Sequence, residues 1–454
     1  MNRWTRCLLV GGMTLWLGGC SGWFKPAKLP PAPAMPEMQQ TVAPLVSIDP
    51  DWWTLFNDPV LNQLQAQLAS GNLNMQLLAA RVRQAQATLA SAQSSVLPTA
   101  SLATGVSRGQ SAGGNPANTV SVTAPLSWEL DVWGRLDATA TAAKAGLQAS
   151  REDLALARLS AQASLVQTYV AIRTAEQQTQ VLTQAQTAYE RALQLTQYRY
   201  DAGVVSAADV AQAQLIEVNS NRTQLLHALD VLLGQAPGQL QLTPSAALPV
   251  VPALPDVVPA ALLQRRPDVR AAQQRVLSAQ ANAGAAQAAF FPNLSFTATA
   301  GYSNNSLGNL FSASNLLWSM GPSMALSLLD GGKRKAAEAD ALAALDAAGI
   351  AYKQTVLQGL QEVQDNLVAA YQLQLQSQAQ AQALQAAQRN LSISEAQYAA
   401  GTVSYLNVVT AQTAALSAER SVLDIQSRRV LAVTQLMKNL AGRLSTSFVA
   451  GREN

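Results

Sequence analysis

Gln197-Tyr198-Arg199-Tyr200-Asp201-Ala202-Gly203-Val204-Val205-Ser206 returns later in the chain as Glu395-Ala396-Gln397-Tyr398-Ala399-Ala400-Gly401-Thr402-Val403-Ser404. Five positions match at a spacing of 198 residues: Tyr200/Tyr398, Gly203/Gly401, Val205/Val403, Ser206/Ser404 and Val210/Val408. A second set matches at a spacing of 194 residues: Arg81-Val82, Ala85, Ala87 and Pro98 with Arg275-Val276, Ala279, Ala281 and Pro292. Units of about 200 residues are far longer than the repeats of solenoid proteins. The sequence therefore predicts a tandem duplication with two pseudo-equivalent halves.

The N-terminus has the features of a secretory signal peptide. Arg3 and Arg6 precede an apolar stretch, 8–17, that is too short to span a bilayer permanently. The tetrapeptide Leu17-Gly18-Gly19-Cys20 resembles a bacterial lipobox, which implies cleavage before Cys20 and lipid modification of that residue. Ser21 resembles the signal that directs lipoproteins to the outer membrane. An ordinary signal peptide with a chance cysteine is the alternative.

Composition argues against several functional classes. Without the signal peptide the chain has 28 basic and 27 acidic residues, so its net charge falls from +3 to +1 and nucleic-acid binding is not expected. One cysteine remains, which excludes an internal disulfide. His227 is the only histidine, and the sequence has no P-loop, nucleophile elbow or cysteine pair. We therefore expect no enzymatic activity, no cofactor and no metal site.

Alternation of apolar and polar residues predicts four β-strands. In 118–130 the apolar face consists of Val120, Val122, Ala124, Leu126, Trp128 and Leu130. The same period runs through 293–302 and 318–328, and more weakly through 99–108. Turn-rich segments join these strands in pairs, so each half contributes one β-hairpin, 99–130 and 293–329.

The strands have the length and the aromatic pattern of membrane strands. A tilted strand of about ten residues crosses a bilayer, and aromatic side chains fall near the predicted strand ends, at Trp128, Trp133, Tyr302 and Trp318. A soluble four-stranded sheet is the alternative, but its apolar face would need a bulky helical cover that the Ala/Gln-rich helices do not offer. Because lipid does not tolerate open strand edges and the smallest barrels have about eight strands, a membrane barrel must be shared between subunits.

The rest of the chain is predicted to be helical. The stretches 136–200 and 333–400 contain no proline, and a 65-residue helix would be about 100 Å long, which is too long for a compact domain. Shorter helices are predicted at 72–97, 207–234, 268–291 and 404–441. Charged residues make up 13% of the chain, against about 25% in typical soluble domains. A solid coiled-coil rod is the alternative, but it would show sustained Leu or Ile at heptad positions, and these helices do not.

Several motifs resemble those of the outer-membrane factor family, the TolC-like exit ducts of bacterial tripartite efflux pumps, and within it the lipoprotein branch. They are Asp-Trp-Trp-Thr-Leu-Phe-Asn-Asp-Pro at 51–59, Ser-Trp-Glu-Leu-Asp-Val-Trp-Gly-Arg at 127–135, Leu-Leu-Gln-Arg-Arg-Pro-Asp-Val-Arg at 262–270, and the two Tyr-x-x-Gly turns. The resemblance covers nearly the whole mature chain. It implies an α+β membrane protein: a trimeric 12-stranded β-barrel, four strands per chain, continued by a long periplasmic α-helical barrel with a mixed equatorial belt.

The expected organisation combines the motifs with the duplication. It comprises a signal peptide (1–19), a lipid anchor and Pro-rich tether (20–48), a first repeat (49–236), a Pro-rich equatorial linker (237–267), a second repeat (268–441) and a C-terminal tail (442–454). The belt is expected to be built from about 45–70, the 237–265 segment and the tail.

The function implied by the resemblance is passive conduction from periplasm to exterior. The homotrimer would sit in outer-membrane lipid and open when a periplasmic adaptor protein and an inner-membrane efflux transporter dock at its periplasmic end. The cargo would be small toxic compounds or drugs. Polypeptide secretion through the same architecture is one alternative, and a non-conducting structural envelope protein is another. The polar strand faces favour a water-filled lumen over a plugged rod.

The resemblance also assigns roles to the two turns. Gly203, Val204, Val205 and Ser206, with Gly401, Thr402, Val403 and Ser404, would be the periplasmic tips that contact the adaptor. Glycine permits the positive φ that a reversal often needs, and each serine is a predicted N-cap. Without the resemblance, both would be simple helical-hairpin turns.

A gate is expected beside the tips, where the chain departs from its family. Asp209 matches a family aspartate, although Ser206-Ala207-Ala208-Asp209 also has the form of a capping box. Tyr398 and Leu406 match gate positions, but Thr410 and Thr413 stand where many members carry an acid and an arginine. Two threonines cannot form an ion pair. We therefore predict an apolar constriction near Leu406, Tyr398 and Tyr405, with a ring of Asp209 side chains favouring cations.

Overall fold

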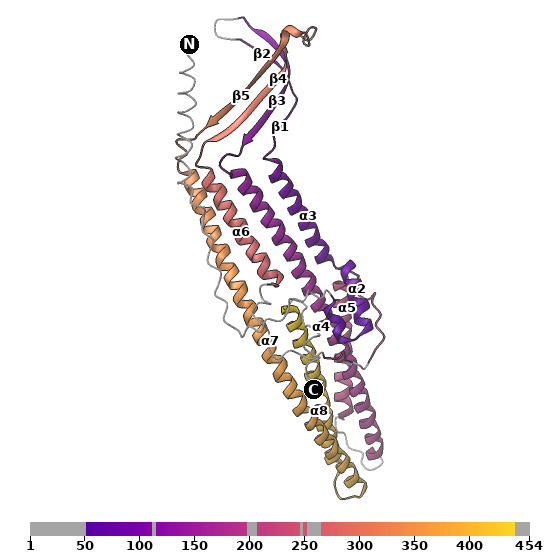
Figure 1. The fold of residues 1–454 in the computed structure, drawn as a ribbon. Coiled ribbons are helices and arrows are strands. Elements are labelled where there is room, and N and C mark those ends of the chain that lie inside the picture. Colours follow the sequence, from indigo (N-terminus) through magenta and orange to yellow (C-terminus); the bar gives the residue numbers. More distant parts are fainter. Residues whose placement is uncertain (1–50, 111–114, 198–206, 246–247, 252–264, 441–454) are drawn as a thin grey trace. The chain divides into compact units, whose positions relative to one another are not determined.

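The computed structural model describes residues 51–110, 115–197, 207–245, 248–251 and 265–440 (Figure 1). Cys20, the signal peptide, the tether and the turn 203–206 lie outside the described residues. The elements are η1 (Trp52–Phe56), α2 (Pro59–Gly71), α3 (Leu73–Ser94), β1 (Thr99–Ala100), β2 (Ala103–Gly109), β3 (Ala117–Leu130), α4 (Arg135–Gln197), α5 (Ala207–Leu232), α6 (Pro267–Ala288), β4 (Asn293–Asn304), η3 (Ala313–Asn315), β5 (Leu316–Ala325), α7 (Lys333–Ala399) and α8 (Tyr405–Asn439).

The chain forms two compact units. Of the described residues, 82–150 and 271–353 make up one unit, which holds all the strands and is called the sheet unit. The remainder forms the helical unit: 51–81, 151–270 and 354–440, with the gaps given above. No helix within the described residues combines the length and the hydropathy that crossing a bilayer requires.

The sheet is antiparallel and has the order β1-β3-β4-β5, with β2 also paired to β3. β1 and β2 face successive parts of β3, because Thr99 is opposite Ser127 and Ala103 is opposite Thr123. They therefore occupy one lane, and the sheet has four lanes, as the sequence predicts. The lane of β1 and β2 is interrupted opposite Pro125. The Pro125 carbonyl accepts a hydrogen bond from Ser101 N (3.0 Å), but proline has no N–H to donate in return.

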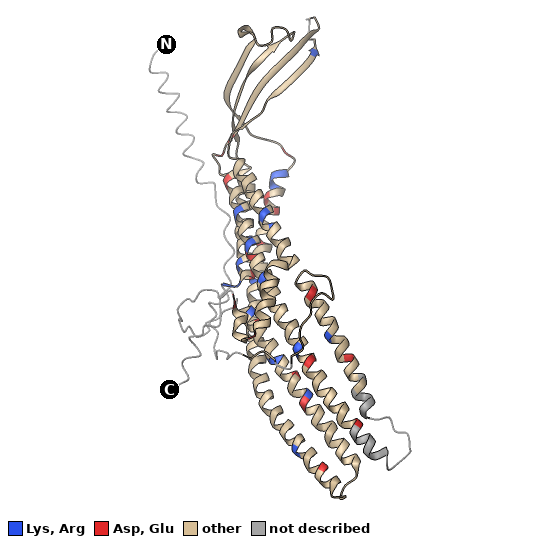
Figure 2. Ribbon diagram, turned by 90° about the vertical axis from the view of Figure 1, so that its right-hand side faces the viewer, with Lys and Arg blue, Asp and Glu red and all other residues tan. Residues whose placement is uncertain are grey.

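Apolar side chains of the strands are exposed. Val106, Trp318, Met320 and Met324 each keep 66–76% of their surface accessible. The strands are also almost free of charge, with Arg108 and Glu129 as the exceptions (Figure 2). Such a surface fits a hydrocarbon environment better than water.

The two long helices begin at matching structures. Asp131 accepts bonds from the N–H groups of Leu136 (3.0 Å) and Asp137 (2.7 Å) at the start of α4. Asp330 does the same for Gly332 (3.0 Å) and Arg334 (3.3 Å) at the start of α7. A carboxylate at this place satisfies free N–H groups and interacts favourably with the helix dipole. The duplication therefore extends to the starts of both long helices.

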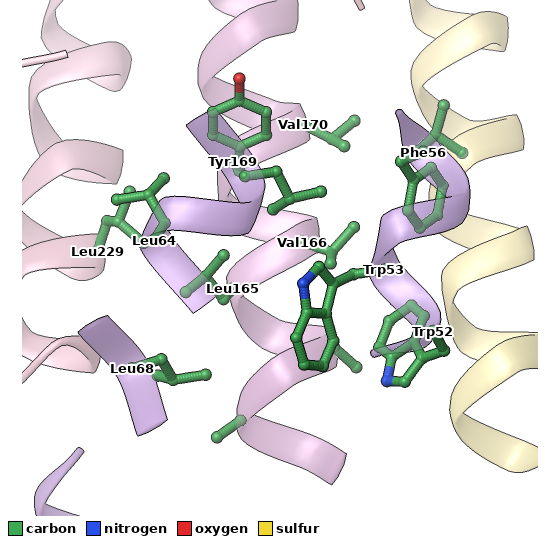
Figure 3. Packing of buried hydrophobic residues seen from close by; sticks show 14 of the residues in the cluster. Trp52, Trp53, Phe56, Leu64, Leu68, Leu165, Val166, Tyr169, Val170 and Leu229 are labelled. Atoms are coloured by element: carbon green, nitrogen blue, oxygen red, sulfur yellow. The ribbon is translucent and has the colours of Figure 1, made fainter. Parts of the chain in front are cut away.

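The helical unit has an aromatic core that the periodicity did not predict. Trp52 and Phe56 of η1 are buried, and they pack with α2 against Val166 and Tyr169 of α4 (Figure 3). Asp58 caps α2 through Val60 N (2.9 Å) and Leu61 N (3.1 Å). Its other oxygen accepts the Tyr169 hydroxyl (2.7 Å), and burial, followed by this bond, raises the pKa of Tyr169 to about 12.

A buried carboxylate ties the segment after α5 to the helices. Glu176 accepts bonds from Arg173 (2.7 Å), from Arg222 (2.9 and 2.7 Å) and from Ser245 N (3.0 Å). Arg173 also donates to the carbonyl of Thr243 (2.8 Å). The side chains of Arg173 and Glu176 are only 4% and 5% exposed. Part of the predicted belt is thus fixed by one charge network.

Glu176→Gln should lower the free energy of unfolding by about 3–5 kcal/mol, because it leaves two arginine charges without their shared anion. Urea unfolding of the purified protein in detergent, followed by circular dichroism, measures this change. Glu190→Gln is the control: Glu190 is exposed and bonds only Gln186 (2.8 Å) among the described contacts, so its change should stay within about 0.5 kcal/mol. Equal effects of the two variants would contradict the assigned role of Glu176.

Candidate functional site: the second tip and its helices

The second turn joins α7 to α8 through a glycine-terminated helix end. Gly401 has φ +74°, and its N–H donates to the carbonyl of Tyr398 (2.9 Å), while Thr402 N donates to that of Gln397 (3.0 Å). This pair of bonds is the Schellman arrangement, which needs a left-handed residue at the position of Gly401. Gly401, Thr402 and Ser404 are exposed, and Val403 is half-buried. The turn therefore presents small side chains outward.

Ser404 occupies the N-cap position of α8, as predicted, but its side chain makes no capping bond. Asn407 N bonds the carbonyl of Ser404 instead (3.1 Å). The predicted N-cap position of Ser404 is therefore confirmed, and the first turn of α8 is closed by this backbone bond. Gly203, Val204, Val205 and Ser206 of the first tip lie outside the described residues. Asp209 lies in the first turns of α5, but its side chain is outside the described part.

Two of the predicted gate residues are in contact. The rings of Tyr398 and Tyr405 pack edge to face, with centroids 5.2 Å apart. The Tyr405 hydroxyl is buried and has no hydrogen-bond partner among the described residues. Burial, with smaller contributions from Tyr398, Tyr189 and Glu395, raises the pKa of Tyr405, so the phenol is neutral at physiological pH. The pair is therefore an uncharged contact between α7 and α8.

The other gate candidates do not join this contact. Leu406 is 70% exposed. The hydroxyls of Thr410 and Thr413 donate to backbone carbonyls of their own helix, at Leu406 and Val409 (both 2.9 Å). Thr413 also lies 3.5 Å from the Tyr189 hydroxyl. Among the described residues, no ion pair involves these positions.

Contacts between the two repeats were missed in the sequence. Tyr189 of α4 meets Thr413 of α8, and Arg420 of α8 donates to Gln214 of α5 (2.9 Å). The repeat spacing of 198 residues matches Arg420 with Arg222 and Gln412 with Gln214, but it does not indicate this contact, since Arg222 binds Glu176. Among the described residues, no cluster of His, Cys, Asp or Glu could hold a metal ion.

Comparison with known proteins identifies the family. The family described as "Outer membrane efflux protein" matches residues 64–235, within the first repeat, and 258–442, which begins in the predicted linker and covers the second repeat. The probable efflux pump outer membrane protein TtgC of Pseudomonas putida is 29% identical over 466 residues, covering 96% of each chain. The outer membrane protein OprJ of Pseudomonas aeruginosa is 29% identical over 333 residues, covering 69% of this chain and 68% of that protein.

Solved structures agree with this match. The outer-membrane channel OprN superposes with a TM-score of 0.81 at 28% identity, covering 86% of this chain and 92% of that one. The open state of the MtrE outer membrane channel of Neisseria gonorrhoeae gives 0.78 at 26% identity, covering 84% and 89%. The α+β architecture of helices and sheet expected from the sequence is confirmed. The chain belongs to the outer membrane efflux protein family.

Proposed function

We propose that this chain is the outer-membrane exit duct of a tripartite efflux pump. It conducts small toxic compounds or drugs passively from the periplasm to the exterior, and its partners are a periplasmic adaptor and an inner-membrane transporter. The exposed apolar strand surface, with Trp318, Met320 and Met324, carries the proposal, because it suits a wall in contact with lipid. Relatives named as efflux pump outer membrane proteins support the transport role. Lipid on Cys20 would add a second anchor.

The open edges of the sheet support a homotrimer. Within the described residues, the lane of β1 and β2 pairs only with β3, and β5 pairs only with β4, so both outer edges have unpaired backbone groups. Lipid cannot satisfy these groups. Three copies of four lanes would close a 12-stranded barrel, which exceeds the smallest membrane barrels of about eight strands.

The purified protein should run as a trimer by native mass spectrometry in detergent and should conduct ions in a planar bilayer. A stable monomer or dimer would contradict the shared barrel. A trimer without conductance, even with the partner proteins added, would favour a structural envelope protein.

Bulky charged residues at the tips should abolish efflux without preventing assembly of the trimer. Val204→Arg with Thr402→Arg should abolish efflux, because bulky cations at both turns would block a close contact between small-residue tips and the adaptor. Drug susceptibility of cells measures efflux, and cross-linking measures the trimer. Gln378→Arg is the matched control, since Gln378 is exposed on α7 more than twenty residues before the turn. Normal resistance in the double variant would refute the tip assignment.

The gate should depend on Leu406 and not on Thr413. Leu406→Ser should make the duct leaky, because a hydrophobic constriction closes by dewetting and a hydroxyl favours water there. Thr413→Ala should change little, since its hydroxyl mainly bonds its own helix. Vancomycin sensitivity of cells reads the leak, and resting conductance should scale with bulk conductivity. A leaky Thr413→Ala duct beside a tight Leu406→Ser duct would overturn the apolar gate.

A further inference from the structure

A cavity of about 890 Å³ lies among α4, α5, α7 and α8 within one chain. Its lining is mostly polar and includes Gln214, Gln376, Arg420, Arg428 and one carboxylate, Asp424, while Leu416 and Ile425 supply apolar surface. We call it the four-helix pocket. Its volume falls within the range of about 300–1,000 Å³ that is typical of small-molecule sites.

Arg420 is the cation of this pocket that lacks an anion. Its guanidinium donates to the Gln214 side chain at 2.9 Å, and among the described residues it has no ion-pair partner. Arg428 differs, because it pairs with Asp424 on the same helix at 3.5 Å and both side chains are more than half exposed. Arg420 is half-buried, so its charge is less screened by water than that of Arg428.

The duplication shows what is missing beside Arg420. Its counterpart in the first repeat, at the spacing of 198 residues, is Arg222, which binds the buried carboxylate of Glu176 at 2.7 Å. The position that corresponds to Glu176 is Gln374, a neutral amide. The second repeat has thus kept the arginine and lost the carboxylate. Gln374 is exposed and does not line the pocket, and Arg420 lines it together with Gln214 of the first repeat.

We propose that the four-helix pocket binds a small organic carboxylate through Arg420, whose counterpart Arg222 binds a carboxylate within the protein. A guanidinium offers two parallel N–H donors to a carboxylate, which gives a charge-assisted contact with defined geometry. Leu416 and Ile425 would contact the apolar part of the ligand. The lining of the pocket includes no residue of the second tip, 401–404, and of the predicted gate residues on α7 and α8 it includes Thr413.

The test uses 4-(trifluoromethyl)benzoate and its neutral analogue 4-(trifluoromethyl)benzamide as probes. Fluorine NMR line broadening of each probe is measured against the full-length protein in a non-ionic detergent. We expect saturable broadening of the benzoate, at least tenfold weaker binding of the benzamide, and weaker benzoate binding as salt is raised. Absence of saturable benzoate binding, or equal binding of the two probes, would overturn the proposal.

Two variants assign the site. Arg420→Gln should weaken benzoate binding at least tenfold, and Gln376→Glu should do the same by placing a carboxylate in the pocket while leaving Arg420 in place. Arg389→Gln is the control, since Arg389 is exposed on α7 and does not line the pocket. Native mass spectrometry confirms that each variant still assembles. Unchanged binding in Gln376→Glu, or an equal loss in Arg389→Gln, would refute the site. Conductance is recorded separately, so failure of the duct function is distinguishable from failure of this proposal.

Discussion

The unpaired edges of the sheet are the constraint on which the rest of the molecule depends. Every backbone N–H and C=O in hydrocarbon needs a partner within the protein. One chain supplies four lanes and leaves the lane of β1 and β2 open on one side and β5 open on the other. The proposed trimer satisfies these edges by closing the sheet into a barrel, which encloses a space. In the proposed barrel, the apolar side chains that are exposed on the strands face lipid, and the serines and threonines between them face water.

The duplicated halves have diverged where charge is buried. In the first repeat, Glu176 forms a network with Arg173, Arg222 and the backbone of Ser245. Removal of one charged member of this network would leave a buried charge uncompensated. The second repeat has Tyr371 and Gln374 at the positions that correspond to Arg173 and Glu176. The pair α4 and α5 is therefore fixed by ionic contacts. Between α7 and α8, Gln380 donates to the carbonyl of Ala418 (3.4 Å), and Arg420 of α8 bonds Gln214 of the first repeat.

Local sequence patterns predicted most of the helices and strands. The contacts that they did not predict depend on packing between residues far apart in the sequence. Alternation located β3, β4 and β5, absence of proline located α4 and α7, and Gly401 located the turn. The helix α2 was not predicted, whereas the predicted start of the next helix at 72 agrees with α3. Asn72 caps α3 through Met75 N (3.0 Å) and donates to the carbonyl of Leu232 (2.8 Å). The second of these bonds joins residues 160 positions apart, and no local pattern indicates it. The burial of Trp52 and the contact of Arg420 with Gln214 likewise depend on how distant helices dock.

The packed tyrosines beside the second turn have an energetic consequence. A buried hydroxyl without a hydrogen bond destabilises the folded state by about 1–3 kcal/mol, because it has lost its hydrogen bonds to water and forms none within the protein. Tyr405 carries this cost as long as its ring stays against Tyr398 and its hydroxyl finds no partner among the described residues. Any rearrangement of α7 and α8 that exposes this hydroxyl to water removes that free-energy cost. About 1.4 kcal/mol corresponds to a tenfold change in an equilibrium. Among the described residues, the buried hydroxyl of Tyr405 therefore opposes the ring contact that holds α7 and α8 together.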